Sequence, residues 1–166
     1  MRLAAVVAED MRFLEHTGLE WYGMVLAWRA SRSGAPLRGY STISQQLVKN
    51  LFLWPAQTYT RKLIEAAISI AMECLWPKER ILEIYLNVVQ FGEGLYGIAA
   101  ASRRYFNTTP EKLDDDQAAW LAAILPDPVG VQVGQPQARV VRRVEEIRAS
   151  MNAHAARNAP IFTTVI

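Results

Sequence analysis

Residues 38–65 read RGYSTISQQLVKNLFLWPAQTYTRKLIE, and the rest of the chain is organised around this stretch. Four of its residues are cationic, and its only acidic residue is the last one, Glu65. The acid-free run begins earlier, because six Lys or Arg but no Asp or Glu occur between Glu20 and Glu65. A basic, amide-rich surface of this kind suits an anionic ligand such as a phosphate or pyrophosphate. Charge alone leaves open the alternative of an ordinary solvated cationic face.

Two glutamates, Glu9 and Glu65, lie on either side of the basic run, and paired carboxylates are a common arrangement for proton transfer. The spacing of apolar residues predicts a helix over Leu3–His16. On such a helix Glu9, Phe13 and His16 would share one face. That pattern fits an acid/base pair, but for these two residues alone it favours a simple ion pair on a helix surface.

Composition limits the classes of protein to consider. A length of 166 residues fits one domain, or one domain with a tail, and 51% hydrophobic residues suffice for a core. A net charge of +2 is too small to indicate nucleic acid, so we expect no nucleic-acid partner. The single cysteine, Cys74, excludes an internal disulfide framework. The apolar runs are shorter than the roughly 20 residues of a membrane span.

Residues 19–30 are aromatic and apolar. A stripe at helical spacing runs through them: Trp21, Met24, Val25 and Trp28. The stripe could pack in a core, or it could touch lipid, since Trp favours the membrane interface. Residues 31–39 (SRSGAPLRG) are rich in Gly, Pro and Ser, so we expect a loop that acts as a mobile flap.

Ser41 and Thr42 open the next predicted helix, and Thr42 with Gln45 fits the capping-box pattern. Its expected buried side has four-residue spacing: Ile43, Leu47 and Leu51. Another side is polar: Gln46, Lys49 and Asn50. Amides and a lysine beside a helix N-terminus suit an anion or a sugar.

The following helix is expected over residues 58–75, where Arg61 and Glu65 are four apart and so face the same way. An i,i+4 ion pair is the simplest interpretation of these two residues. Helical patterns continue to the end of the chain, over residues 78–89, 98–106, 114–125 and 136–152, with a glycine-rich turn at 91–97. Because no segment alternates convincingly as a strand, we expect an all-α fold.

Five ordered motifs in these segments resemble those of one family, the peptidoglycan glycosyltransferase domain. This domain occurs in monofunctional biosynthetic transglycosylases and in bifunctional penicillin-binding proteins. The motifs are AEDMRFLEHTG, GYSTISQQLVKNLFL, RKLIEA, ILEIYLN and GIAAASRRYF. The resemblance covers about Val6–Met151, so we expect the domain over residues 1–152 and a tail, a candidate for disorder, over 153–166.

The resemblance implies a lysozyme-like helical fold and a defined reaction. The family transfers a growing glycan from undecaprenyl pyrophosphate to the 4-hydroxyl of lipid II, with inversion, at the periplasmic face of the bacterial cytoplasmic membrane. The implied partners are lipid II, the growing glycan, the membrane surface and other cell-wall synthesis proteins. No cofactor is required by the sequence, although a divalent cation, Mg or Mn, could serve at the pyrophosphate.

The resemblance also implies roles for individual residues. Glu9 matches the general base and Glu65 the second acidic residue, near the pyrophosphate. The other matching positions are expected to bind substrate: Asp10, Phe13, His16, Ser41, Thr42, Gln46, Lys49, Asn50, Arg61 and Lys62.

Three positions depart from the family pattern. Tyr40 stands where a glycine is usual, Gln57 where an arginine is usual and Pro77 where a serine is usual. The chain also begins almost at the first motif, so the family's usual transmembrane anchor is expected to be absent. The alternative function is therefore a non-catalytic descendant that binds lipid II or the cell-wall machinery. A glycan-cleaving hydrolase is a weaker alternative, because it needs no cations for a pyrophosphate.

Overall fold

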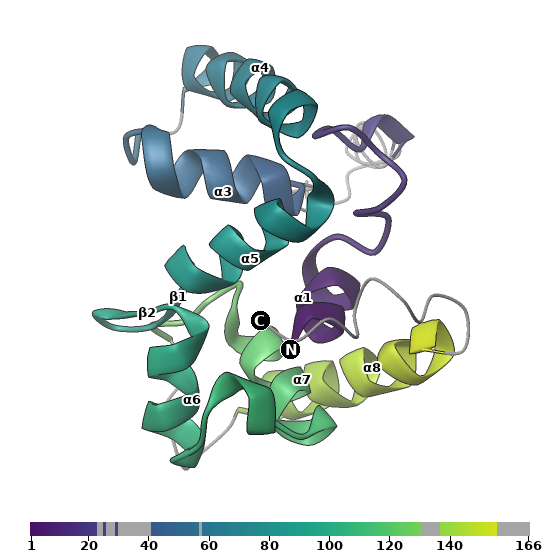
Figure 1. Cartoon of the computed structure of the whole chain (residues 1–166), viewed down its shortest axis with the longest axis vertical. Helices are drawn as coiled ribbons and strands as arrows, with labels where there is room; N and C mark the ends of the chain where they lie inside the picture. The colour runs from purple at the N-terminus through teal and green to yellow at the C-terminus, as the bar shows by residue number, and fades with distance from the viewer. Residues whose placement is uncertain (23–24, 26–28, 30–40, 57, 131–136, 156–166) are drawn as a thin grey trace. The chain divides into compact units, whose positions relative to one another are not determined.

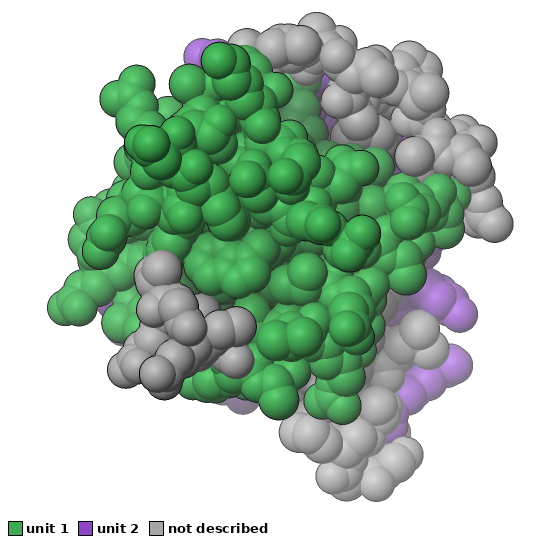
Figure 2. Space-filling view, turned by 90° about the horizontal axis from the view of Figure 1, so that it is seen from below, with its two compact units in different colours: residues 1–11, 82–166 green, residues 12–81 purple. Residues whose placement is uncertain are grey.

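The computed structural model describes residues 1–22, 25, 29, 41–56, 58–130 and 137–155 (Figure 1). The described chain is mostly helical, which confirms the all-α prediction. It divides into two compact units, which Figure 2 colours separately. Unit 1 contains residues 1–11 and 82–166, and unit 2 contains residues 12–81. Helix α5 (Lys78–Val88) begins in unit 2 and ends in unit 1.

Unit 1 is built around a helix with small side chains. Its helices are α1 (Arg2–Glu9), α6 (Ile98–Phe106), the 3-10 turn η1 (Pro110–Lys112), α7 (Asp115–Ile124) and α8 (Ala138–Ala155). Helix α7 packs against both α1 and α8, and its four alanines are all buried. Their small size lets the helix backbones approach closely. Asp114 and Gln117 form the capping box expected at the start of α7.

A short hairpin in unit 1 replaces the simple turn predicted at residues 91–97. Strand β1 (Gln90–Gly92) pairs antiparallel with β2 (Leu95–Tyr96). Gly94 and Gly97 have positive φ angles of 65° and 80°, which glycine adopts without strain. This hairpin is the only sheet among the described residues.

Unit 2 contains two packed helices, α3 (Ile43–Phe52) and α4 (Tyr59–Leu75). Both begin as the sequence predicts, because Thr42 and Gln45 form a capping box and the side chain of Thr58 accepts a hydrogen bond from the Arg61 amide. Leu51 was expected on the buried side of α3, but it is exposed in the last turn, and Val48 is buried instead.

Helix α4 has an unusual distribution of polarity. Its buried residues are mostly polar: Arg61, Glu65, Ser69 and Met72. Its exposed residues include large apolar ones: Leu63, Ile64, Ile70 and Leu75. A helix that only supported a core would show the opposite pattern. Two consequences follow: a buried polar cluster inside unit 2 and an apolar surface outside it.

Candidate functional site

Glu65 is the centre of the buried polar cluster in unit 2. The Arg61 guanidinium donates from Nη1 to Glu65 Oε2 at 2.8 Å, and the exposed fractions of these two side chains are 9% and 2%. Lys62 forms an ion pair with the other carboxylate oxygen of Glu65. The predicted i,i+4 pair is therefore present, but as one part of a triad of two cations and one acid, in which Arg61 and Glu65 are buried and Lys62 is partly exposed.

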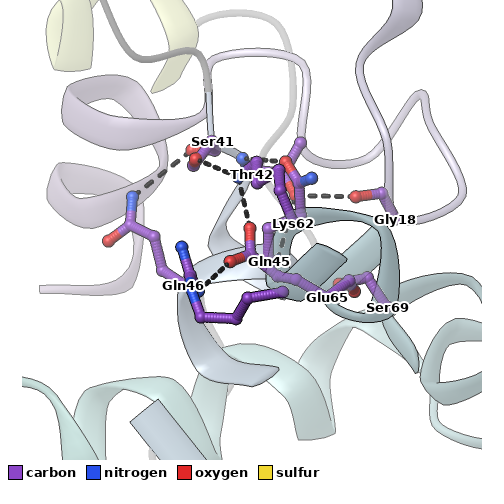
Figure 3. A network of polar contacts seen from close by, with 9 residues as sticks. Gly18, Ser41, Thr42, Gln45, Gln46, Lys62, Glu65 and Ser69 are labelled. Carbon is purple, nitrogen blue, oxygen red and sulfur yellow. Dashed lines mark hydrogen bonds and ion pairs between the residues drawn. The ribbon is translucent and has the colours of Figure 1, made fainter. Parts of the chain in front are cut away.

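The triad is joined to the start of α3 (Figure 3). Lys62 Nζ donates to Ser41 Oγ at 2.8 Å. Thr42 Oγ1 donates to the Gly18 carbonyl at 2.7 Å, in addition to its capping role. These contacts connect Lys62 and Glu65 with the start of α3, where Ser41 and Thr42 lie.

Gly18 allows the loop after the first motif to lie against α4. Its φ is +90°, and a Cβ at this position would meet the Ser69 carbonyl oxygen at 2.9 Å. Ser69 in turn donates from Oγ to the Glu65 carbonyl at 2.7 Å. A side chain at residue 18 would therefore disturb the backbone that carries Glu65.

The polar side of α3 is only partly connected to this cluster. Gln46 Nε2 donates weakly to the Ser41 carbonyl at 3.4 Å. Lys49 and Asn50 are exposed, and within the described ranges no hydrogen bond or ion pair links them to Glu65 or its partners. They remain accessible to a ligand.

An opening of about 350 Å3 lies at the start of α4. Its lining residues are Thr58, Tyr59, Arg61 and Lys62. The Nε atom of Arg61 is buried and has no hydrogen-bond partner in the part of the chain that the structure describes. Two cations beside an opening, one with an unused donor, have the charge and the hydrogen-bonding capacity that suit an anion such as a phosphate.

Glu9 is the last residue of α1, in unit 1. Its Oε1 accepts a hydrogen bond of 3.1 Å from Arg143 Nη2 on α8, and the same nitrogen donates to the Ala8 carbonyl at 3.0 Å. The exposed fractions of the Glu9 and Arg143 side chains are 11% and 37%. Glu9 is thus partly open to solvent and paired with a cation from a distant part of the sequence.

The helix predicted over Leu3–His16 is too long. The chain leaves the helix at Asp10, which is buried and has φ −158° and ψ 72°. Phe13 and His16 therefore lie in a loop, and the expected helical face with Glu9 does not exist. Phe13 is buried beneath Lys78, whose Nζ lies 4.4 Å from the ring centre, and it stacks edge-on with His16. We attribute the end of α1 at Asp10 to this burial of Phe13.

Tyr85 on α5 adds a buried phenol near Glu9. Burial is the main cause that raises the pKa of Tyr85 well above its usual value, and the charges of Glu9 and Asp10 raise it further. A neutral phenol and two carboxylates therefore lie close together at the end of α1.

Sequence reasoning missed two functional candidates. Arg143 is separated from Glu9 by 134 positions, and no motif points to it. Ser69 is four residues after Glu65 on the same helix, so helical spacing could have identified it.

Several predictions lie outside the described residues. They concern Tyr40, Gln57, Met24, Trp28 and the flap at 31–39. The described members of the aromatic stripe, Trp21 and Val25, are helical and exposed.

The described parts of the chain contain no group of three or more His, Cys, Asp or Glu residues arranged to hold a metal ion. None of the described helices combines the length and the apolar character that crossing a membrane requires.

Comparisons with known proteins agree on one family. The family model "Transglycosylase" matches residues 1–152. A biosynthetic peptidoglycan transglycosylase of Pasteurella multocida is 43% identical over 151 residues, which are 91% of this chain and 61% of that protein. One of Chromohalobacter salexigens is 45% identical over 150 residues, covering 90% of this chain and 64% of that protein. The chain thus spans about three fifths of the length of these curated relatives. Together with the helical architecture, the matches confirm the lysozyme-like class expected from the sequence.

Proposed function

Because the chain belongs to the transglycosylase family, we propose that it polymerises the glycan strands of peptidoglycan. The donor is the growing glycan on undecaprenyl pyrophosphate, and the acceptor is the 4-hydroxyl of lipid II. The observation that carries the proposal is the opening at the start of α4. There a buried arginine with an unused donor and a lysine surround a space suited to a pyrophosphate.

Arg61 and Lys62 have the role of stabilising the leaving group. As the bond between the sugar and the pyrophosphate breaks, negative charge grows on the phosphate oxygen, and fixed cations stabilise that charge. Glu65 keeps both cations in place through its two oxygens. A Mg or Mn ion carried in by the pyrophosphate would add further positive charge to this group.

Glu9 has the role of general base. The acceptor hydroxyl loses its proton to the Glu9 carboxylate while its oxygen bonds to the anomeric carbon of the donor. The departing pyrophosphate takes the electron pair of the broken bond. Attack opposite the leaving group inverts the anomeric centre, and no covalent intermediate on the protein is needed.

A membrane surface fits the exposed apolar residues of unit 2. Leu63 and Leu75 on α4 are 72% and 79% exposed, and Tyr59 and Phe52 are exposed nearby in the sequence. Large exposed apolar patches mark interaction surfaces, and the substrates of this reaction carry lipid chains. We place the reaction at the periplasmic face of the cytoplasmic membrane, where other cell-wall synthesis proteins would be partners.

One assay separates this function from its alternatives. The chain is incubated with labelled lipid II in vesicles, and the products are separated by length. Long glycan supports polymerisation. Binding without reaction favours the non-catalytic descendant, and shortening of preformed glycan favours a hydrolase.

A further inference from the structure

At the end of α1, Glu9 is paired with Arg143, a residue that lies outside the five sequence motifs. Arg143 reaches from α8 to α1 and contacts two groups with a single nitrogen, the Glu9 carboxylate and the Ala8 carbonyl. The first contact neutralises charge, and the second fixes the guanidinium to the backbone of the last helical turn. Together they hold the carboxylate in one orientation relative to α1.

The charge of Arg143 matters for the ionisation of Glu9, because other charged and titratable groups also lie near this carboxylate. Asp10 follows directly in the sequence and is buried, and Tyr85 on α5 is fully buried. Burial raises the pKa of Tyr85, and the negative charges of Glu9 and Asp10 raise it further, so the phenol lies within electrostatic range of both acids. Asp115 on α7 interacts electrostatically with the amino group of Met1, which is at the opposite end of α1 from Glu9. Neighbouring negative charge and burial favour protonation of a carboxylate, and a close guanidinium opposes it.

We propose that Arg143 is a positioning residue that keeps Glu9 ionised and oriented for proton abstraction. The inference rests on the proposed function of Glu9 as the general base. Arginine suits the role because it stays protonated at all physiological pH values and cannot compete with Glu9 for the proton of the acceptor hydroxyl. Its planar group also keeps its hydrogen-bond directions fixed, which a flexible lysine does not.

The test compares three variants of the full chain. Arg143→Met removes the charge and keeps much of the apolar stem. Arg143→Lys restores the charge without the planar geometry. Arg148→Met is the matched control, because Arg148 is on the same helix and pairs with Asp116 at 2.6 Å in an exposed position. Circular dichroism and thermal unfolding establish that each variant is folded.

Two readouts follow. The first is the pH profile of kcat/KM for lipid II polymerisation. The second is the titration of the Glu9 carboxyl carbon by NMR, assigned by its absence in Glu9→Gln. We expect Arg143→Met to move the acidic limb of the profile and the Glu9 midpoint upward by about one pH unit. Arg143→Lys should restore most of this shift, and Arg148→Met should cause none.

The outcomes distinguish the two proposals. A rate loss in Arg143→Met that is equal at every pH, with an unchanged Glu9 titration, overturns the role of Arg143 and assigns it a structural one. If the unaltered chain does not polymerise lipid II, the proposed function fails. The NMR titration then still decides whether Arg143 controls the ionisation of Glu9.

Discussion

The two candidate catalytic carboxylates are held in different ways. Glu65 is almost completely buried, and two cations from the preceding turn of its own helix occupy both of its oxygens. Glu9 is partly exposed, and Arg143, from the far end of the sequence, contacts its Oε1. Because both oxygens of Glu65 are engaged with cations, we propose that Glu65 holds these cations and that Glu9 transfers the proton.

The first prediction removes the base and tests this assignment most directly. Glu9→Gln should reduce polymerisation by roughly two to four orders of magnitude, because an amide cannot take the proton of the acceptor hydroxyl. Stability should change by less than about 1 kcal/mol, since the glutamine oxygen can still accept the hydrogen bond from Arg143. Turnover of lipid II and thermal unfolding measure the two effects. Near-normal turnover in the folded variant contradicts the assignment.

The second prediction makes the same substitution at the other carboxylate. Glu65→Gln leaves Arg61 buried without its counter-ion, so we expect a loss of about 3 kcal/mol in the free energy of unfolding. Urea unfolding of this variant beside Glu9→Gln measures the contrast. A further variant, Glu73→Gln, is a useful reference, because Glu73 is also buried in unit 2 but pairs with Lys78 and Ser44 instead. Equal costs for Glu9→Gln and Glu65→Gln would show that the two sites do not differ as described.

How far the sequence predicts these sites depends on the range of the interactions. The cap at Thr42 and the pairing of Arg61 with Glu65 arise within one helical turn, and both are predicted correctly. The end of α1 at Asp10 is missed, because no Gly or Pro marks it and the burial of Phe13 beneath Lys78 decides it. Arg143 is missed for the same reason, since only the tertiary packing of α8 on α1 places it at Glu9.

The polarity of α4 shows the same limit. Its apolar residues have helical spacing, and the usual interpretation is that such a face is buried. In the structure the polar face is buried, and there Arg61 and Ser69 both donate hydrogen bonds to Glu65. Periodicity identifies the helix, and only the contacts show which face points outward.

The third prediction concerns the exposed apolar face of α4. In our proposal this face of unit 2 binds the membrane, and unit 1 does not. Replacing Leu63 and Leu75 with Ser should weaken binding to anionic liposomes by roughly tenfold, because less apolar area is transferred from water to lipid. A co-sedimentation assay measures the change. The matched control replaces two exposed valines of unit 1, Val129 and Val141, with Ser. Equal losses in both double variants would mean that α4 is not the membrane-binding surface.

The fourth prediction concerns Tyr85, the buried phenol near Glu9. Among the contacts that the structure describes, Glu65 has no such phenol beside it. The raised pKa of Tyr85 means that the folded chain keeps its proton at a pH where the unfolded chain, with an ordinary value near 10, loses it. Below about pH 10 both states are protonated, and the group has no effect on the pH dependence of stability. Above it the unfolded state binds fewer protons than the folded state, so stability falls as pH rises.

Tyr85→Phe should remove this alkaline loss while leaving most of the ring packing in place. We expect the free energy of unfolding of the variant to fall less steeply above pH 10, by up to about 1.4 kcal/mol per pH unit. Urea unfolding at several pH values between about 8 and 11 measures the two slopes. Tyr96→Phe is the control, because solvent already reaches that ring in the folded chain. If the Tyr85→Phe slope matches that of the unaltered chain, Tyr85 ionises as readily when folded as when unfolded. The phenol then contributes nothing to the electrostatic difference between the Glu9 and Glu65 sites.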